Sequence, residues 1–178
     1  MPKFKDIPQF TQDSPYNVDQ SVRYIDQWLV DAYIKDYGLQ MCPDFQRGHV
    51  WTEAQQIAYV EYLFQGGKSG LDIYFNDPEW QSGKGGKDFV LVDGLQRLTA
   101  VLRFVHNEIP IFGHFYRDFT DKMPFLVSFR VHVNTLQTKA EVLRWYVEMN
   151  SGGTPHTQAE IDRVKAMWEA ETAKKGKK

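Results

Sequence analysis

The stretch FVLVDGLQRLTAVLRF, residues 89–104, decides the fold because its hydrophobic period changes halfway along. Residues 88–92 are predicted to form a strand, and its apolar run FVLV is typical of a strand that is buried on both faces. Asp93 and Gly94 follow, and the next apolar residues then recur at helical spacing: Leu98, Val101, Leu102 and Val105. The stretch therefore predicts a strand, a tight turn and a helix.

Polar side chains crowd the turn between this strand and this helix. The first amides of a helix have no internal partner and carry partial positive charge, so this end suits an anion. Gly94 allows the close approach of a ligand, and Arg97 offers a planar fork of donors for phosphate oxygens. Asp93 could hold a metal ion or accept a proton, Gln96 could orient a water, and Thr99 could donate to an oxygen. The alternative interpretation is that Asp93 caps the helix and Arg97 makes a surface ion pair.

A second Gln-Arg pair occurs upstream. The segment PDFQRGHVW, residues 43–51, places Gln46 and Arg47 in a loop between two aromatic residues, with His49 as a candidate acid or base. Because each pair stands beside a turn glycine, the two arginines are expected to converge on a polyanion such as a triphosphate. A lone Gln-Arg pair on a surface loop is the alternative.

A third segment, MNSGGTPHT at residues 149–157, joins two predicted helices. Asn150 at a helix end, with Gly152 and Gly153 after it, forms a second loop that could hold an oxyanion. His156 in the same segment is another candidate acid or base. The alternative is that this segment is only a linker.

Periodicity along the rest of the chain predicts one α+β domain. An irregular arm over 1–17, a single domain over 18–170 and a basic disordered tail over 171–178 are expected. Helices are predicted over 19–36 and 52–65, after Gly94, and from Thr138 and Thr157. Strands are predicted over 71–75, 88–92 and 127–133, with a short β-like piece over 109–112.

Composition excludes several classes of protein. Hydrophobic residues make up 42% of the 178 residues and aromatic residues 15%, enough for a packed core. Without the four lysines of the last five residues, the formal charge falls from −2 to −6, so a broad non-specific grip on nucleic acid is not expected. A single cysteine, Cys42, excludes disulfides within the chain and cysteine-cluster metal sites. No membrane-spanning run is present, and a cytoplasmic location is expected.

Taken in order, PDFQRGHVW, LVDGLQRLTAV and MNSGGTPHTQAE resemble the N-terminal domain of GmrSD-type restriction proteins. That family carries a PxFQR-x-x-W stretch, then DGQQR, then an Asn-Gly-Gly segment. The motif order is also similar to the nucleotide-binding domain of ParB partition proteins and to sulfiredoxin. The resemblance implies a ParB/sulfiredoxin-like α+β fold with a small mixed sheet and about five helices. It also implies binding of a nucleoside triphosphate with Mg²⁺, and its hydrolysis, in bacterial or phage defence or counter-defence.

The resemblance assigns roles by position in the motifs. The family's DGQQR corresponds to Asp93, Gly94, Leu95, Gln96 and Arg97, its first motif to Gln46 and Arg47, and its third to Asn150, Gly152 and Gly153. Leu95 replaces the first glutamine of DGQQR, which makes binding a safer expectation than turnover. The alternative functions are a non-catalytic interaction module and a ParB-like DNA nuclease. DNA, a host or phage protein and a second copy of the chain are the corresponding alternative partners.

Overall fold

A four-stranded mixed sheet forms the centre of the molecule. The computed structural model describes residues 3–12, 16–46, 48, 50–82, 88–150 and 158–175. The strands are β1 (Asn17–Ser21), β2 (Asp72–Asn76), β3 (Val90–Asp93) and β4 (Ser128–Asn134), in the spatial order β1-β4-β2-β3. The β2–β4 pair is parallel, and the β1–β4 and β2–β3 pairs are antiparallel.

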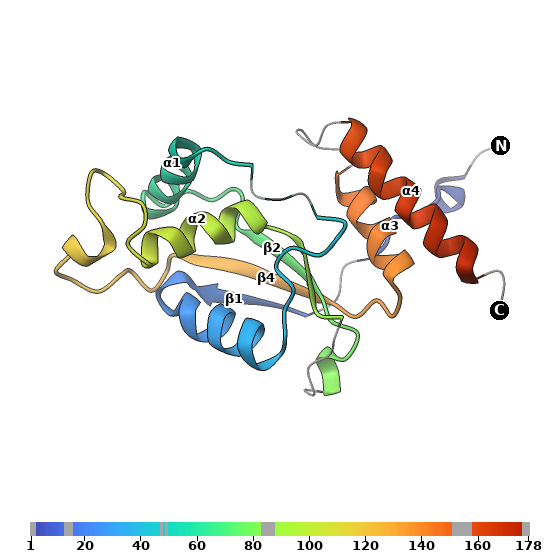
Figure 1. The fold of residues 1–178 in the computed structure, drawn as a ribbon, viewed down its shortest axis with the longest axis horizontal. Helices are drawn as coiled ribbons and strands as arrows, with labels where there is room; N and C mark the ends of the chain where they lie inside the picture. The colour runs from blue at the N-terminus through green and yellow to red at the C-terminus, as the bar shows by residue number, and fades with distance from the viewer. Residues whose placement is uncertain are drawn as a thin grey trace.

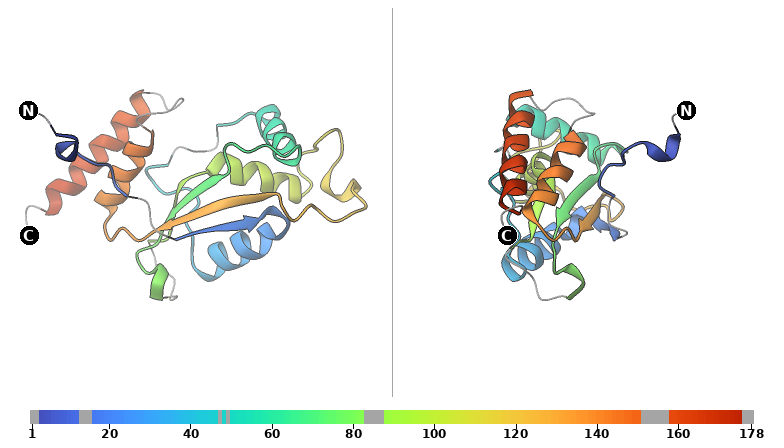
Figure 2. Two further views of the ribbon diagram at one scale, coloured as in Figure 1. Left: turned by 180° about the vertical axis from the view of Figure 1, so that it is seen from behind. Right: turned by 90° about the vertical axis from the view of Figure 1, so that its right-hand side faces the viewer.

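Five helices of eleven or more residues surround this sheet in the described part of the chain. They are a π-helix (Asp26–Asp36), α1 (Glu53–Phe64), α2 (Leu95–Val105), α3 (Lys139–Asn150) and α4 (Gln158–Lys175). Short 3-10 turns occur at Phe4–Asp6, Val22–Tyr24, Trp80–Ser82 and Tyr116–Asp118. Figures 1 and 2 show α3 and α4 packed together at one end of the molecule, away from α1. The predicted α+β class, with a small mixed sheet and five helices, is confirmed.

The sheet is covered by two separate hydrophobic clusters. Ile73, Phe75 and Val131 are fully buried in the larger one, together with residues of α1, α2 and the π-helix. The smaller cluster contains residues of α3 and α4. Leu91 belongs to the first cluster and its neighbour Val92 to the second. Because successive side chains of a strand point to opposite faces, β3 is covered on both sides, as its sequence predicts.

The helix predicted over 19–36 is wrong in its first part. Residues Asn17–Ser21 instead form β1, which pairs with the outer edge of β4. The Trp28 indole donates to the Ser21 carbonyl oxygen at 3.1 Å and fixes the chain where it leaves the strand. Val22, Ile25 and Leu29 are all buried, so the apolar pattern identified core residues correctly. The error arises because pairing with a distant strand overrides local period.

Smaller differences concern the ends of elements. The piece over 109–112 is not a strand, since Ile111 makes only an isolated bridge with His114 around a two-residue turn. Helix α4 continues through Lys175, into the tail predicted to be disordered from residue 171. Among the described helices, none combines the length and apolar character that a membrane crossing requires.

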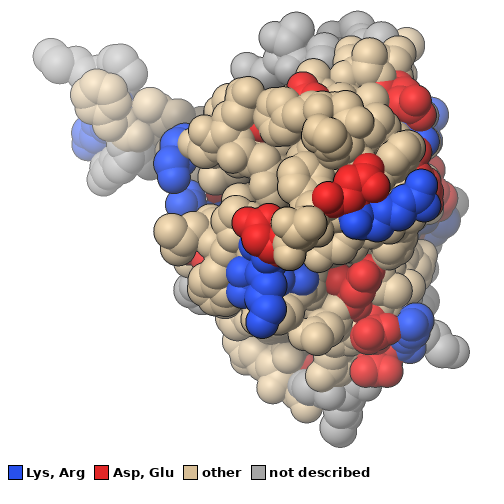
Figure 3. Space-filling model, turned by 90° about the vertical axis from the view of Figure 1, so that its left-hand side faces the viewer, with Lys and Arg blue, Asp and Glu red and all other residues tan. Residues whose placement is uncertain are grey.

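Charges are mixed on the surface at the end of the molecule farthest from α4. In Figure 3 the Lys and Arg side chains of the described residues there lie among Asp and Glu and do not merge into one basic area. Arg103 illustrates the pattern, since it pairs with Glu53 at 2.9 Å and Glu108 at 3.1 Å. On this face the described basic side chains therefore have acidic neighbours.

Candidate functional site

The turn between β3 and α2 has the backbone shape that its sequence predicts. Gly94 lies between Asp93, the last residue of β3, and Leu95, the first residue of α2, with φ +116° and ψ 3°. Its carbonyl oxygen accepts the hydrogen bond from the Leu98 amide at 2.9 Å, which begins the helix. A Cβ at this position would lie 2.6 Å from Cδ1 of Ile73. Both the dihedral angle and the packing therefore require glycine.

Arg97 lies in the first turn of α2 with only part of its guanidinium in use. Its Nη2 contacts Oδ2 of Asp93 at 2.7 Å, and the two side chains are 21% and 40% exposed. Its Nε is buried and has no hydrogen-bond partner among the described residues. Because an unpaired buried donor is unfavourable by about 1–3 kcal/mol, an acceptor oxygen that met this nitrogen after a shift of the side chain would relieve that cost. The ion-pair alternative is thus correct for one edge of the guanidinium and leaves the Nε unexplained.

Tyr59 of α1 and the aliphatic part of Arg97 both lie beside Gly70. The Arg97 Cδ lies near Gly70, where an added Cβ would be 3.8 Å away. The Tyr59 hydroxyl donates to the Gly70 carbonyl oxygen at 2.6 Å, and the Tyr59 ring meets Trp51 edge-on at 5.2 Å. Burial raises the pKa of Tyr59 above its usual range, so this hydroxyl stays protonated. The arginine is therefore fixed on one side by neutral, rigid groups.

Gln96, in the turn motif at residues 93–97, makes hydrogen bonds to the backbone of the upstream PDFQRGHVW segment. Its Oε1 accepts from the amides of Val50 and Trp51, both at 3.0 Å, and its Nε2 donates to the Gly48 carbonyl oxygen at 3.3 Å. The carboxamide therefore holds the loop after the first Gln-Arg pair against the start of α2. The spacing of residues in the sequence did not predict this positioning contact; it indicated only that Gln96 could orient a water.

We expect Gln96→Ala to lower the free energy of unfolding by about 1–2 kcal/mol, because it leaves two backbone amides and one carbonyl without their partner. Gln96→Glu keeps the oxygen that accepts from both amides, but it replaces the donor to Gly48 with an oxygen that faces the carbonyl oxygen. Urea denaturation of both variants measures the difference. Wild-type stability of Gln96→Ala would contradict the assigned contact.

Gln46 connects the PDFQRGHVW segment to β3. Its Nε2 donates to the carbonyl oxygens of Val92 at 3.2 Å and Leu91 at 3.4 Å, so the segment lies against β3. Gln46 and Gln96 thus both bond backbone groups next to the turn, whereas the predicted convergence concerns the two arginines. Arg47 and His49 lie outside the described residues.

The remaining predicted residues are less closely connected to the turn. Helical geometry places Thr99 about 200° around the axis from Arg97, so the two side chains leave α2 on different sides. Asn150 is the last residue of α3, and its Nδ2 donates to the Tyr146 carbonyl oxygen at 2.7 Å. Gly152, Gly153, His156 and Thr157 lie outside the described residues.

One histidine on the sheet was not singled out by any sequence motif. Tyr74 of β2 is in register with Asp93 on one side and with His132 on the other. The His132 ring stacks on Tyr74 at 4.6 Å, and its Nε2 lies 2.8 Å from Oδ1 of Asp72. The alternation of residues 127–133 placed His132 on the polar face of its strand, but only the strand order shows that it lies in line with Asp93, two strands away across Tyr74.

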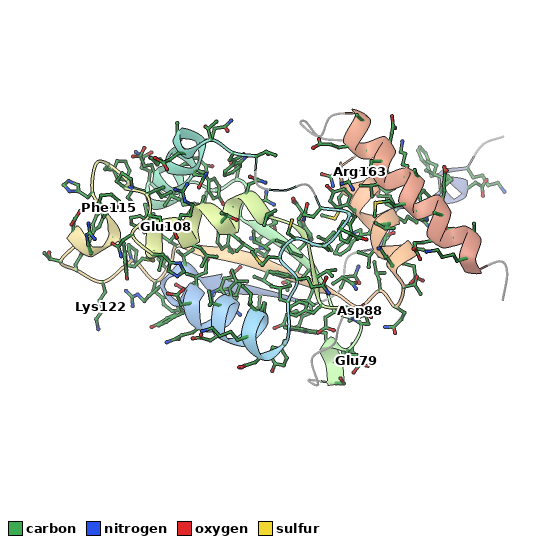
Figure 4. The ribbon with its side chains drawn as sticks, viewed as in Figure 1. Glu79, Asp88, Glu108, Phe115, Lys122 and Arg163 are labelled. Carbon is green, nitrogen blue, oxygen red and sulfur yellow. The ribbon has the colours of Figure 1, made fainter. Side chains whose placement is uncertain are left out.

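Two hollows of the described surface open away from this turn. One of about 490 Å³ lies between the end of β2 and the start of α3 and is lined by Asn76, Asp88 and Lys139 among others. Asp88 is labelled in Figure 4. The other, of about 570 Å³, borders the start of β4. Neither is lined by residues 94–97.

The chain matches one family model. Residues 28–124, more than half of the chain, match the model for the N-terminal domain of the GmrSD restriction endonuclease. The match includes the first two motifs and ends before the third. No curated protein and no solved structure matches the chain. The chain therefore belongs to the family of GmrSD restriction endonuclease N-terminal domains.

Proposed function

We propose that this domain binds a nucleoside triphosphate at the first turn of α2, as part of a restriction or defence system. The observation that supports this most strongly is the Arg97 Nε, a buried donor without a partner among the described residues, at a helix N-terminus. A phosphate oxygen there would meet both the arginine fork and the partial positive charge of the helix end. The family membership supports the same assignment, because the turn falls within the matched residues.

The described residues fit a metal ion only if the nucleotide brings it. They contain no group of three or more His, Cys, Asp or Glu side chains that could hold one. Mg²⁺ commonly binds through one or two carboxylates together with substrate phosphates and waters. Asp93 supplies one carboxylate beside Arg97, so it is the residue that would contact Mg²⁺ carried by the phosphates. The Mg²⁺ ion would contribute to catalysis by neutralising phosphate charge during phosphoryl transfer.

Binding without turnover is the second candidate, and Leu95 favours it. Leu95 is partly buried and packs against the larger hydrophobic cluster, so it offers neither the donor nor the acceptor of the family's glutamine. The two glutamines that remain, Gln46 and Gln96, are engaged with backbone groups. A domain of this kind could act as a nucleotide-responsive interaction module.

Two assays separate these functions. In calorimetric titrations of wild-type protein with each nucleoside triphosphate and Mg²⁺, we expect a dissociation constant on the order of 1–100 µM for at least one of them, a range typical of nucleotide sites. Phosphate release then distinguishes hydrolysis from binding alone. Failure to bind any nucleoside triphosphate at millimolar concentration would refute the proposal.

A further inference from the structure

The loop that carries the first Gln-Arg pair is held from the side opposite the sheet by α4. Arg163 donates from Nη2 to the Phe45 carbonyl oxygen at 2.8 Å and from Nη1 to the Asp44 carbonyl oxygen at 3.2 Å. Arg163 is labelled in Figure 4. One side chain thus fixes two consecutive carbonyl groups directly before Gln46.

Contacts from α3 attach the same two residues to the pair of C-terminal helices. Lys139 lies 2.5 Å from Oδ2 of Asp44. The Phe45 ring is 2% exposed and packs edge-on against Tyr146 at 5.3 Å. Asp44 and Phe45 are therefore fixed by α3 and α4, and Phe45 shares its hydrophobic cluster with Val92 of β3, to which the next residue, Gln46, is bonded. The peptide bond between Phe45 and Gln46 therefore joins a residue held by α3 and α4 to a residue bonded to β3.

This arrangement connects α4 to the candidate nucleotide site. The loop that leaves Gln46 is bonded at Val50 and Trp51 to Gln96, which neighbours Arg97. Residues 44–45 thus adjoin Gln46, which is bonded to the carbonyl oxygen of Val92, two residues before Gly94. Arginine suits the role because its planar fork can serve two acceptors at once, which the single ammonium group of lysine cannot do in the same geometry.

We propose that Arg163 is a positioning residue for nucleotide binding, setting the place of Gln46 against the end of β3 without contacting nucleotide. The expected effect of Arg163 on nucleotide affinity rests on the proposed function. Its effect on the position of the loop can be tested without nucleotide. Arg163 lies outside the residues that match the family model, so this connection is not a feature of the matched region.

The test compares Arg163→Ala and Arg163→Lys with Arg144→Ala as a matched control. Arg144 also bonds a carboxylate and a carbonyl, those of Glu148 at 2.7 Å and Gln9 at 3.4 Å, but it touches the N-terminal arm instead of the loop. We expect Arg163→Ala to weaken Mg²⁺-nucleotide binding about tenfold, Arg163→Lys to be intermediate, and Arg144→Ala to stay within about twofold of wild type.

Hydrogen exchange supplies the second measurement. The amides of Gln46, Val50 and Trp51 donate hydrogen bonds within the loop assembly and should exchange about tenfold faster in Arg163→Ala only. Wild-type affinity in Arg163→Ala, or an equal loss in Arg144→Ala, would overturn the inference. If the wild-type protein binds no nucleotide, the proposed function fails. Exchange alone then decides, with faster exchange supporting the positioning role and unchanged exchange refuting it.

Discussion

Gly94→Ala is expected to lower the free energy of unfolding by about 3 kcal/mol, the sum of a backbone and a packing penalty. The φ of +116° is one that residues with a Cβ rarely adopt. The added Cβ would also lie 2.6 Å from Cδ1 and 3.1 Å from Cγ2 of Ile73, which is fully buried in the larger cluster. Thermal or chemical denaturation measures the loss.

Gly38→Ala separates the two penalties. Gly38 has a φ of +72°, yet an added Cβ would meet nothing within 4 Å, so only the backbone penalty of about 1 kcal/mol should remain. Ile73→Val removes the Cδ1 atom and should therefore cost less in the Gly94→Ala background than in the wild type. If Gly94→Ala were no more destabilising than Gly38→Ala, the close approach to Ile73 would be wrong.

Arg97→Ala is expected to weaken nucleotide binding about 100-fold, because it removes the fork that would bind phosphate beside the helix end. Its effect on stability should be below about 1 kcal/mol, since a partly exposed ion pair contributes little to folding. Arg97→Lys keeps the charge and loses the bidentate geometry, so its affinity should fall between those of the other two proteins. Titration of the three proteins with the same nucleotide and Mg²⁺ provides the comparison.

Asp93→Asn distinguishes two roles for the carboxylate that pairs with Arg97. If Asp93 contacts the metal ion, the variant should lose the Mg²⁺ dependence of binding. If Asp93 only orients the guanidinium across their 2.7 Å contact, affinity should fall while the Mg²⁺ dependence remains. Affinity equal to that of wild type in both Arg97→Ala and Asp93→Asn would show that the nucleotide binds elsewhere.

The turn at Gly94 could be predicted from sequence because its signals are local. A run of apolar residues, a glycine and a change of period lie within sixteen residues, and β3, the turn and α2 follow in that order. The two-sided burial of Leu91 and Val92 was also visible in the apolar run. Residue type and spacing were sufficient wherever neighbouring residues decide the structure.

The elements that sequence did not predict depend on distant partners. β1 exists because residues Asn17–Ser21 pair with β4, more than a hundred residues away. Likewise, no pattern in the sequence predicted that the Gln96 side chain accepts from the amides of Val50 and Trp51. None predicted that Arg163 donates to the Phe45 carbonyl oxygen. Each of these is a contact with the backbone of another segment, for which residue patterns provide no register.

The central claim is that the first turn of α2 holds the phosphates of a nucleotide. It is tested most directly by titrating isotopically labelled protein with nucleoside triphosphate and Mg²⁺ while following the backbone amide resonances. We expect the largest shifts at Gly94, Leu95, Gln96 and Arg97. Saturable binding whose shifts are confined to other regions, such as the hollow lined by Asn76 and Lys139, or no shifts at millimolar nucleotide, would contradict it.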